Sequence, residues 1–280
     1  MANVPMIQLN DEHTIPQLGL GVWKASDDEA EFAVRTAIEH GYRLIDTATI
    51  YGNEAGVGRA IASSGVARDD LFVTTKLWNG DQGYDETLKA FEKSLATLGL
   101  EYVDLYLIHW PTPQRDLYVD TWKAFEKLHS DGLIKSIGVS NFKPHHLEDL
   151  MSKTDIVPAV NQIELHPRFT QAETRAFCDE HEIRVESWSP IGGSKGAGNI
   201  LNESLLEAIG QKYGKTPAQV ILRWHIQLGL IVIPKSVHAE RIAENIDIFD
   251  FELSSEDMAH IATLETGERQ GPDPDEMNHH

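Results

Sequence analysis

The 280-residue chain contains a single cysteine, Cys178, and no apolar run close to the roughly 20 residues that a membrane-spanning helix requires. One thiol cannot form an internal disulfide, and the N-terminus lacks the basic-then-apolar pattern of a secretory signal. The sequence therefore predicts a cytoplasmic protein that does not insert into a membrane.

Basic residues are also scarce, since 24 Lys and Arg stand against 44 Asp and Glu and give a formal net charge of −20. This charge repels nucleic-acid phosphates and anionic lipid surfaces, so we expect neither as a partner. An anionic ligand would need a local basic pocket. No apolar seam in the sequence requires a dimer, and we expect a monomer.

Several catalytic signatures are absent. The chain has no GxSxG nucleophile motif, no HExxH motif and no Cys pair for a metal. Cys178 lies in the helix-like stretch AETRAFCDEHE and is interpreted as a packing residue. His145 and His146 lie in KPHHLEDL, which predicts an exposed first helical turn. We therefore expect no bound metal.

The sequence does contain a regular alternation of β-branched apolar runs and amphipathic segments. A predicted hairpin, residues 6–18, precedes them, and segments such as 27–41 and 84–99 have the three-and-four apolar spacing of helices. The strand-like runs number eight: GLGVW (19–23), YRLIDTA (42–48), LFVTTKLW (71–78), VDLYLIHW (103–110), KSIGVSN (135–141), PAVNQIEL (158–165), IRVESWS (183–189) and LIVIPKS (230–236).

Eight strands separated by helices predict parallel pairing with right-handed crossovers and a closed (β/α)8 TIM barrel. No change in composition divides the chain, so we expect one domain over residues 1–280. The last long connection contains the loop GGSKGAG (192–198) and two extra helices, near 202–213 and 217–227. A doubly wound open sheet is the alternative, but GLGVWK supplies only two of the glycines that its nucleotide fingerprint needs.

Polar or aromatic residues stand where most of these runs end. The C-terminal ends of barrel strands meet at one mouth, where catalysis takes place in this fold. Each residue alone is more often a solvated or capping group than a functional one, and it is their convergence that favours a site. The residues are Asp46, Lys76, His109, Ser140, Asn141, Gln162, Trp188 and Lys235.

Four residues of this mouth could carry acid–base chemistry on a carbonyl group. A Lys76 ammonium held by Asp46 would lower the pKa of the Tyr51 phenol, normally about 10, and make it a proton donor. His109 could hold the carbonyl oxygen. Because the chain offers no nucleophile, the attacking group would be hydride from a cofactor.

Other groups suit a nicotinamide cofactor. Trp188 offers a flat face for the ring, and Asn141 and Gln162 offer the donors and acceptors that a carboxamide needs. The segment PKSVHAERIAEN (234–245) places Lys235, Ser236, His238 and Arg241 where a helix begins, which favours a phosphate.

Together these motifs resemble the aldo-keto reductase family, from IPQLGLG to RIAEN. The matching blocks are GYRLIDTATIYGNE, TTKLW, IHWP, SIGVSNF, VNQIELHP and IPKS. YGNEAGVG, ARDDLFVTTKLWN, HWPTP and GKTPAQVILRWH look closest to bacterial 2,5-diketo-D-gluconate reductases. The resemblance implies NADPH-dependent reduction of aldehydes or ketones, including dicarbonyls and keto-sugar acids, without a Rossmann fold.

The resemblance also implies roles for individual residues. The catalytic tetrad would be Asp46, Tyr51, Lys76 and His109, with Tyr51 as general acid. The cofactor would contact Ser140, Asn141, Gln162, Trp188, Lys235, Ser236, Val237, His238, Arg241 and Asn245. The substrate pocket would contain Trp23, Tyr51, Trp78, His109 and Trp110. His238 occupies a position for which the resemblance suggests Arg, so we expect NADH to be accepted as a weaker alternative cofactor.

Two other functions stay open at this point. One is a barrel hydrolase with two carboxylates, for which Glu164 and Glu186 lie near strand ends. The other is a non-enzymatic module that senses nicotinamide nucleotides, because a fold does not fix a function. The hydrolase leaves Tyr51 and Lys76 without a role, and an intact tetrad argues against the sensing module.

Overall fold

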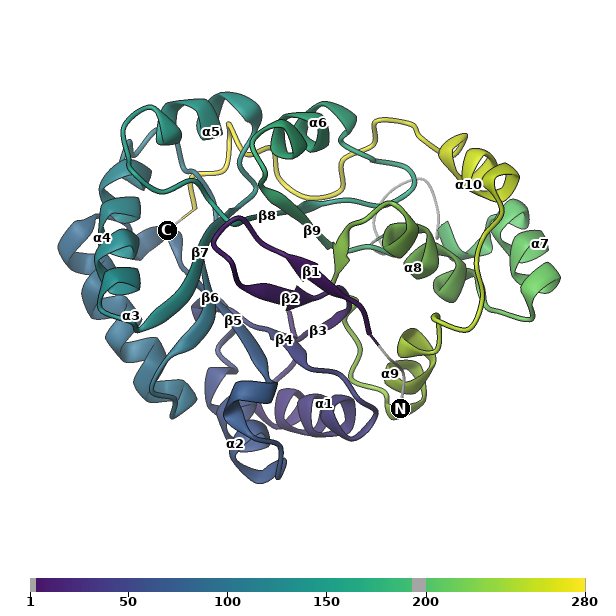
Figure 1. Ribbon diagram of the computed structural model, residues 1–280, viewed down its shortest axis with the longest axis horizontal. Helices are drawn as coiled ribbons and strands as arrows, with labels where there is room; N and C mark the ends of the chain where they lie inside the picture. The colour runs from purple at the N-terminus through teal and green to yellow at the C-terminus, as the bar shows by residue number, and fades with distance from the viewer. Residues whose placement is uncertain (1–3, 193–199, 280) are drawn as a thin grey trace.

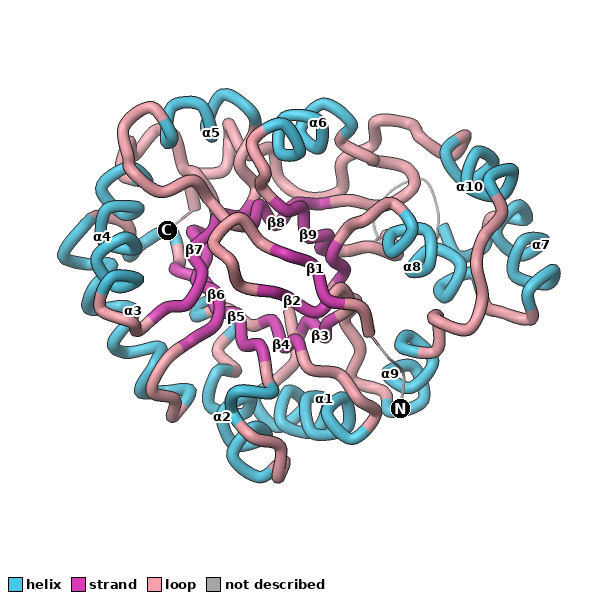
Figure 2. Tube along the Cα trace, viewed as in Figure 1, coloured by secondary structure: helices cyan, strands magenta, loops and turns pink. Residues whose placement is uncertain are grey.

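The computed structural model describes residues 4–192 and 200–279. Within them, eight parallel strands pair in chain order from β3 to β10 and surround one axis (Figures 1 and 2). The strands are β3 (Gly19–Gly21), β4 (Leu44–Asp46), β5 (Phe72–Leu77), β6 (Val103–Ile108), β7 (Ile134–Ser140), β8 (Val160–Glu164), β9 (Arg184–Trp188) and β10 (Ile231–Val232). Parallel bridges between Leu18 and Val232 and between Gly21 and Lys235 join the two edges, so the predicted (β/α)8 barrel is confirmed.

The last predicted strand is shorter than its apolar run. Residues 230–236 predicted a strand, but β10 ends at Val232. Pro234 has no N–H to donate, although its carbonyl accepts a hydrogen bond from Gly21 N at 3.1 Å. Beyond Val232 the chain stays attached to the barrel through the Ile233 N–H, which donates to Ser187 O at 3.3 Å, and through the bridge at Lys235.

Helices surround the sheet on its outer face (Figure 2). Outward-pointing strand residues such as Ile45, Val73 and Tyr106 are buried beneath them in one large apolar cluster. Burying each such side chain contributes about 1.5–3 kcal/mol. The helices are α1 (Asp27–Glu39), α2 (Glu54–Ser63), α3 (Tyr84–Leu98), α4 (Tyr118–Ser130), α5 (Pro144–Met151), α6 (Ala172–Glu180), α7 (Ser204–Tyr213), α8 (Pro217–Gln227), α9 (Ala239–Ile246) and α10 (Ser255–Ala262).

The predicted N-terminal hairpin closes one end of the barrel. Strands β1 (Met6–Gln8) and β2 (Thr14–Pro16) pair antiparallel and lie across the barrel axis in Figure 1. Ile15 packs there against Leu44 and Phe72, which begin the neighbouring strands β4 and β5. Because the strand starts are covered, the strand ends form the open mouth.

The extra elements of the long connection are also confirmed. Helices α7 and α8 match the predicted segments 202–213 and 217–227. The predicted loop 192–198 lies outside the described residues except for Gly192. After α10 the chain runs past α6 and α5 to the C-terminus (yellow in Figure 1). No helix in the described part of the chain is long and apolar enough to cross a membrane.

Candidate active site

The ion pair predicted between Asp46 and Lys76 lies inside the barrel mouth. Asp46 ends β4 and Lys76 lies near the end of the neighbouring β5, and both side chains are buried. Lys76 Nζ donates to Asp46 Oδ1 at 2.6 Å, to Asp46 Oδ2 at 2.8 Å and to the Thr47 carbonyl at 2.9 Å. Burial is the largest single influence and disfavours the ammonium, but Asp46, Tyr51 and Glu186 together outweigh it and keep the pKa of Lys76 above its usual value.

Tyr51 lies in a 3₁₀ turn, Thr49–Tyr51, that brings its phenol back over the mouth. Its hydroxyl is 3.5 Å from Lys76 Nζ. Burial is the largest influence and raises the pKa of Tyr51, while Lys76 lowers it. The predicted effect of Lys76 is therefore present, but the predicted net lowering of the pKa is wrong because burial dominates. Tyr51 is protonated at neutral pH.

His109 directly follows β6, and its backbone N–H donates to Leu77 O at 3.2 Å. Its ring meets the Tyr51 ring edge-on, with 5.8 Å between centroids, and lies 5.4 Å from the Trp78 ring. Burial first, and then the Lys76 cation, hold the pKa of His109 well below its usual value. The imidazole is therefore neutral, and its buried Nδ1 has no hydrogen-bond partner among the described residues.

The residues predicted to hold a nicotinamide form one hydrogen-bonded chain beside this group. Trp188 Nε1 donates to Asn141 Oδ1 at 2.8 Å. Asn141 Nδ2 donates to His109 O and to Ser140 Oγ, each at 3.0 Å. Ser140 Oγ donates to Gln162 O at 2.8 Å. These bonds fix the edge of the Trp188 ring.

Gln162 connects this chain to the ion pair. Its Nε2 donates to Asp46 Oδ2 at 2.8 Å and to Glu186 Oε2 at 2.9 Å. The contact with Glu186 was not predicted from the sequence. The alternation of β9 could have indicated it, since Glu186 lies opposite Gln162 in the register and on the same side as Trp188.

The predicted phosphate-binding residues cluster around the start of α9. Lys235, His238 and Arg241 are exposed, whereas Ser236 and Asn245 are buried and Val237 is half-buried. His238 is the N-terminal cap position of α9, and its backbone N–H donates to Ser236 Oγ at 3.1 Å. Exposed cations at a helix start favour an anion.

The predicted substrate-pocket tryptophans differ in exposure. Trp78 is half-buried beside His109, and Trp110 is buried. Trp23 is 51% exposed and carries the Lys24 ammonium 4.1 Å from its ring centroid. Trp78 therefore lies beside His109, Trp110 is the buried residue that follows His109, and Trp23 is an exposed residue just after β3.

The two carboxylates of the hydrolase alternative are both fully buried and engaged. Glu164 accepts the backbone N–H groups of Gln270 at 2.7 Å and Gly271 at 2.9 Å, which anchors the C-terminal segment. Glu186 is held by Gln162. Cys178 is buried with its pKa raised to about 11 by burial, in agreement with the predicted packing role.

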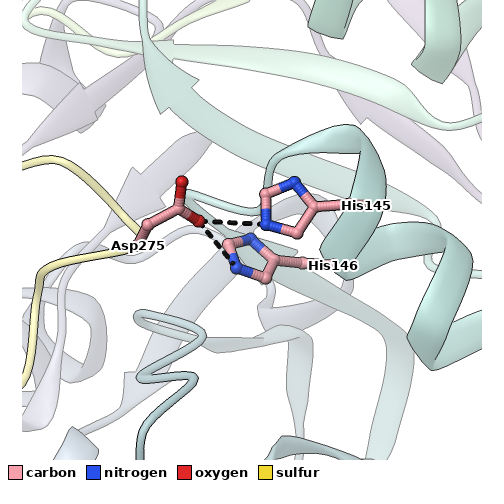
Figure 3. A group of neighbouring side chains, drawn as sticks. All are labelled: His145, His146 and Asp275. Carbon is pink, nitrogen blue, oxygen red and sulfur yellow. Dashed lines mark hydrogen bonds and ion pairs between the residues drawn. The ribbon is translucent and has the colours of Figure 1, made fainter.

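A second anchor of the C-terminal segment corrects the expectation for His146. Figure 3 shows His145 and His146 at the start of α5 pointing toward Asp275, at 3.0 and 3.1 Å. His145 is exposed as predicted, but His146 is buried, because the Tyr118 and Phe142 rings and Asp275 of the C-terminal segment pack against it. Asp275 also pairs with Lys143 Nζ at 2.6 Å.

This group is built as an anchor rather than a metal site. His146 Nδ1 accepts the Lys143 backbone N–H at 3.1 Å, so the neutral ring carries its proton on Nε2, which lies 3.1 Å from Asp275 Oδ1. A metal would need the lone pair of that same Nε2. The carboxylate is already paired with the Lys143 ammonium, which also pairs with Asp273 at 2.5 Å.

Comparison with known proteins agrees with this geometry. The family model described as "Aldo/keto reductase family" matches residues 16–266. The chain belongs to the aldo/keto reductase family. The family assignment, with its reductase relatives and solved structures in complex with NADPH or NADP, confirms the predicted oxidoreductase class and its use of NADP(H).

Individual relatives cover nearly the whole chain. A glyoxal reductase of Bacillus subtilis is 54% identical over 97% of this chain and 96% of its own length. Methylglyoxal reductase DkgA of Salmonella typhimurium is 50% identical over 99% of each. The crystal structure of a Gox0644 mutant in complex with NADPH is 48% identical, with a TM-score of 0.93 over 98% of this chain and 99% of that one.

Proposed function

We propose that this reductase converts small aldehydes, ketones and dicarbonyls to alcohols, with Tyr51 as general acid. The observation that carries the proposal is the position of Lys76 Nζ, which contacts the Asp46 carboxylate at 2.6 Å and the Tyr51 hydroxyl at 3.5 Å. A buried, charge-compensated ammonium beside a phenol stabilises the phenolate that forms when the proton leaves.

Tyr51, His109, Lys76 and Asp46 would each have a separate role in the proton transfer. Tyr51 enters the reaction protonated and gives its proton to the oxygen of the reduced carbonyl. His109, neutral and next to Tyr51, donates a hydrogen bond to the same oxygen and fixes the carbonyl orientation. Asp46 keeps Lys76 charged throughout. NADPH supplies the hydride when bound.

The residues around the mouth fit this cofactor. Trp188 offers its ring face for stacking, and its edge is fixed by Asn141. Ser140, Asn141 and Gln162 would hold the carboxamide. Lys235, Ser236 and Arg241 would hold the adenosine phosphate, with Val237, His238 and Asn245 along the adenosine. The exposed cations at the start of α9 support this part of the proposal.

The substrate class rests on the relatives and on the size of the mouth residues. Two of the relatives are named glyoxal reductase and methylglyoxal reductase, and both names specify a small dicarbonyl substrate. Trp78 and His109 lie 5.4 Å apart at the mouth, and Trp110 follows His109 directly, which favours a small carbonyl compound. We therefore propose glyoxal and methylglyoxal first and keto-sugar acids such as 2,5-diketo-D-gluconate second.

A turnover assay tests this function. The purified protein is incubated with NADPH and each of glyoxal, methylglyoxal, 2,5-diketo-D-gluconate and a simple ketone, while the nicotinamide absorbance is followed. We expect faster loss of absorbance with the dicarbonyls than with the ketone. Tight NADPH binding without turnover of any substrate would instead favour the nucleotide-sensing alternative.

We also propose that residues 1–280 act as one domain and as a monomer in the cytoplasm. A single cooperative unfolding transition and a light-scattering mass near 31.3 kDa would support the first two statements. A twofold larger mass would contradict the monomer. Fractionation of the source cells tests the location.

A further inference from the structure

Glu186 is a buried acid at the centre of the barrel that the proposed reaction does not use. It lies on β9, opposite Gln162 of β8 and Ile231 of β10, and is fully buried. Its Oε2 accepts from Gln162 Nε2 at 2.9 Å, while Oε1 has no partner among the described residues. A buried carboxyl with one unsatisfied oxygen destabilises the fold, which points to a functional reason for it.

The contacts of Gln162 suggest that reason. The Gln162 amide nitrogen donates both of its hydrogens to carboxyl groups, to Asp46 at 2.8 Å and to Glu186 at 2.9 Å. An amide held in this way cannot rotate to exchange its oxygen and nitrogen, because the nitrogen alone can donate to both acceptors. No described residue donates to Gln162 Oε1, so this oxygen is left as an acceptor. We expect Gln162 Oε1 to accept a hydrogen bond from a carboxamide N–H of the cofactor.

The charge of Glu186 depends on the titratable groups around it. The charged and titratable groups around it are Asp46 from β4, Lys76 from β5 and Tyr51 from the 3₁₀ turn, while β8 and β10 present the neutral Gln162 and Ile231. Burial and then repulsion from Asp46 raise the pKa of Glu186 to about 8. The group therefore changes charge just above neutral pH.

We propose that Glu186 is a positioning residue that, together with Asp46, orients Gln162 toward the cofactor carboxamide and, when charged, favours oxidised over reduced nicotinamide. This rests on the proposed role of Gln162 in cofactor binding. The oxidised ring carries a positive charge that the reduced ring lacks, and a carboxylate in a low-dielectric interior attracts it. The affinity ratio of NADP+ to NADPH then rises with pH.

Binding measurements at several pH values test the inference without turnover. The dissociation constants of NADP+ and NADPH are measured by calorimetry between about pH 6 and pH 9. This window spans the ionisation of a carboxyl group whose pKa is raised toward neutral pH. We expect the preference for NADP+ to grow roughly tenfold across this window in the unmodified protein, the change that one pKa unit of coupling gives. Ionisation of the cofactor phosphate cancels in the ratio, because both cofactors carry it.

Two variants separate charge from position. Glu186→Gln keeps the shape and an oxygen that can accept from Gln162, so we expect both cofactors to bind while the ratio no longer changes with pH. Glu186→Asp keeps the charge but shortens the side chain, so the ratio should still change with pH while both affinities fall about tenfold, a loss of about 1.4 kcal/mol. An unchanged pH dependence in Glu186→Gln, or unchanged affinities in Glu186→Asp, would overturn the inference.

A matched control is available in Glu54 of α2. Its carboxyl is also buried, its pKa is raised first by burial, and it accepts from Thr75 Oγ1 at 2.7 Å without contacting Gln162. Glu54→Gln should keep the pH dependence of the unmodified protein, and its loss there would contradict the assignment to Glu186. Failure of the unmodified protein to bind either cofactor would overturn the proposed cofactor site itself and this inference with it.

Discussion

The ammonium of Lys76 lies 2.6 Å from Asp46 Oδ1, and neither side chain has more than 3% of its surface exposed. Two charges in such an interior are stable only as a pair, because each alone would lose its hydration without compensation. Asp46 also accepts from Gln162, so one carboxylate organises both the proposed proton donor and the proposed cofactor contact. The pair therefore contributes to the stability of the fold as well as to the proposed chemistry.

Removing the charge of Asp46 should destabilise the fold. Asp46→Asn has the same size but leaves Lys76 buried without a counter-charge, so we expect the free energy of unfolding to fall by about 3–5 kcal/mol. Urea denaturation followed by circular dichroism measures it. The control is Asp120→Asn, which breaks an exposed pair with Lys123 at 3.2 Å and should leave the stability unchanged. Equal stability of the two variants would show that the buried pair is not needed for folding.

Tyr51→Phe should abolish most reduction while leaving the cofactor site intact. The substitution removes only the hydroxyl that lies 3.5 Å from Lys76 Nζ. We expect kcat for carbonyl reduction to fall on the order of a hundredfold or more, the loss typical of removing one transition-state donor. NADPH affinity, measured by calorimetry, should stay within about twofold of the unmodified protein. Near-normal kcat would exclude Tyr51 as the general acid.

The barrel and the meeting of Asp46, Tyr51, Lys76 and His109 at its mouth were predictable because they depend on local patterns. Strand-forming runs at regular spacing fix the order of a parallel barrel, and every such strand ends at the same mouth. Asp46, Lys76 and His109 could therefore be brought together without knowledge of any long-range contact. Tyr51 followed because its turn lies five residues after Asp46.

The remaining features depend on contacts that no local pattern records. His146 is buried among the Tyr118 and Phe142 rings and Asp275, which lies 129 positions later in the sequence. The raised pKa of Tyr51 reflects burial by the whole mouth, which outweighs the Lys76 contact predicted from the sequence. The contact of Glu186 with Gln162 can be predicted only when the register between β8 and β9 is known.

The basic residues at α9 should distinguish NADPH from NADH. Arg241→Ala removes an exposed cation near the start of α9, and a lost charged hydrogen bond of about 1.5–3 kcal/mol corresponds to a KM for NADPH raised roughly ten- to a hundredfold. The KM for NADH should stay unchanged, because NADH lacks the extra phosphate. His238→Arg should shift the preference in the opposite direction. Lys123→Ala on α4 is the charge control, and equal effects on both cofactors in Arg241→Ala would contradict the phosphate assignment.

The His146 anchor should make the stability of the fold depend on pH. Burial first, and then the neighbouring His145, lower the pKa of His146 from 6.5 to about 4, with Asp275 and Asp273 acting in the opposite direction and Lys143 in the same one. The unfolded chain therefore takes up a proton at higher pH than the folded chain does. The stability that this group contributes is complete above pH 6.5 and is lost as the pH falls toward about 4.

His146→Asn isolates this contribution. The asparagine oxygen can accept the Lys143 backbone N–H in place of His146 Nδ1, but the side chain does not titrate. We expect the unfolding free energy of the unmodified protein to decrease more steeply than that of the variant between pH 6.5 and about 4, as measured by urea denaturation at a series of pH values. Other buried histidines such as His225 contribute equally to both curves, so they cancel in the difference. Parallel curves would mean that His146 is not held neutral by its place beneath the C-terminal segment.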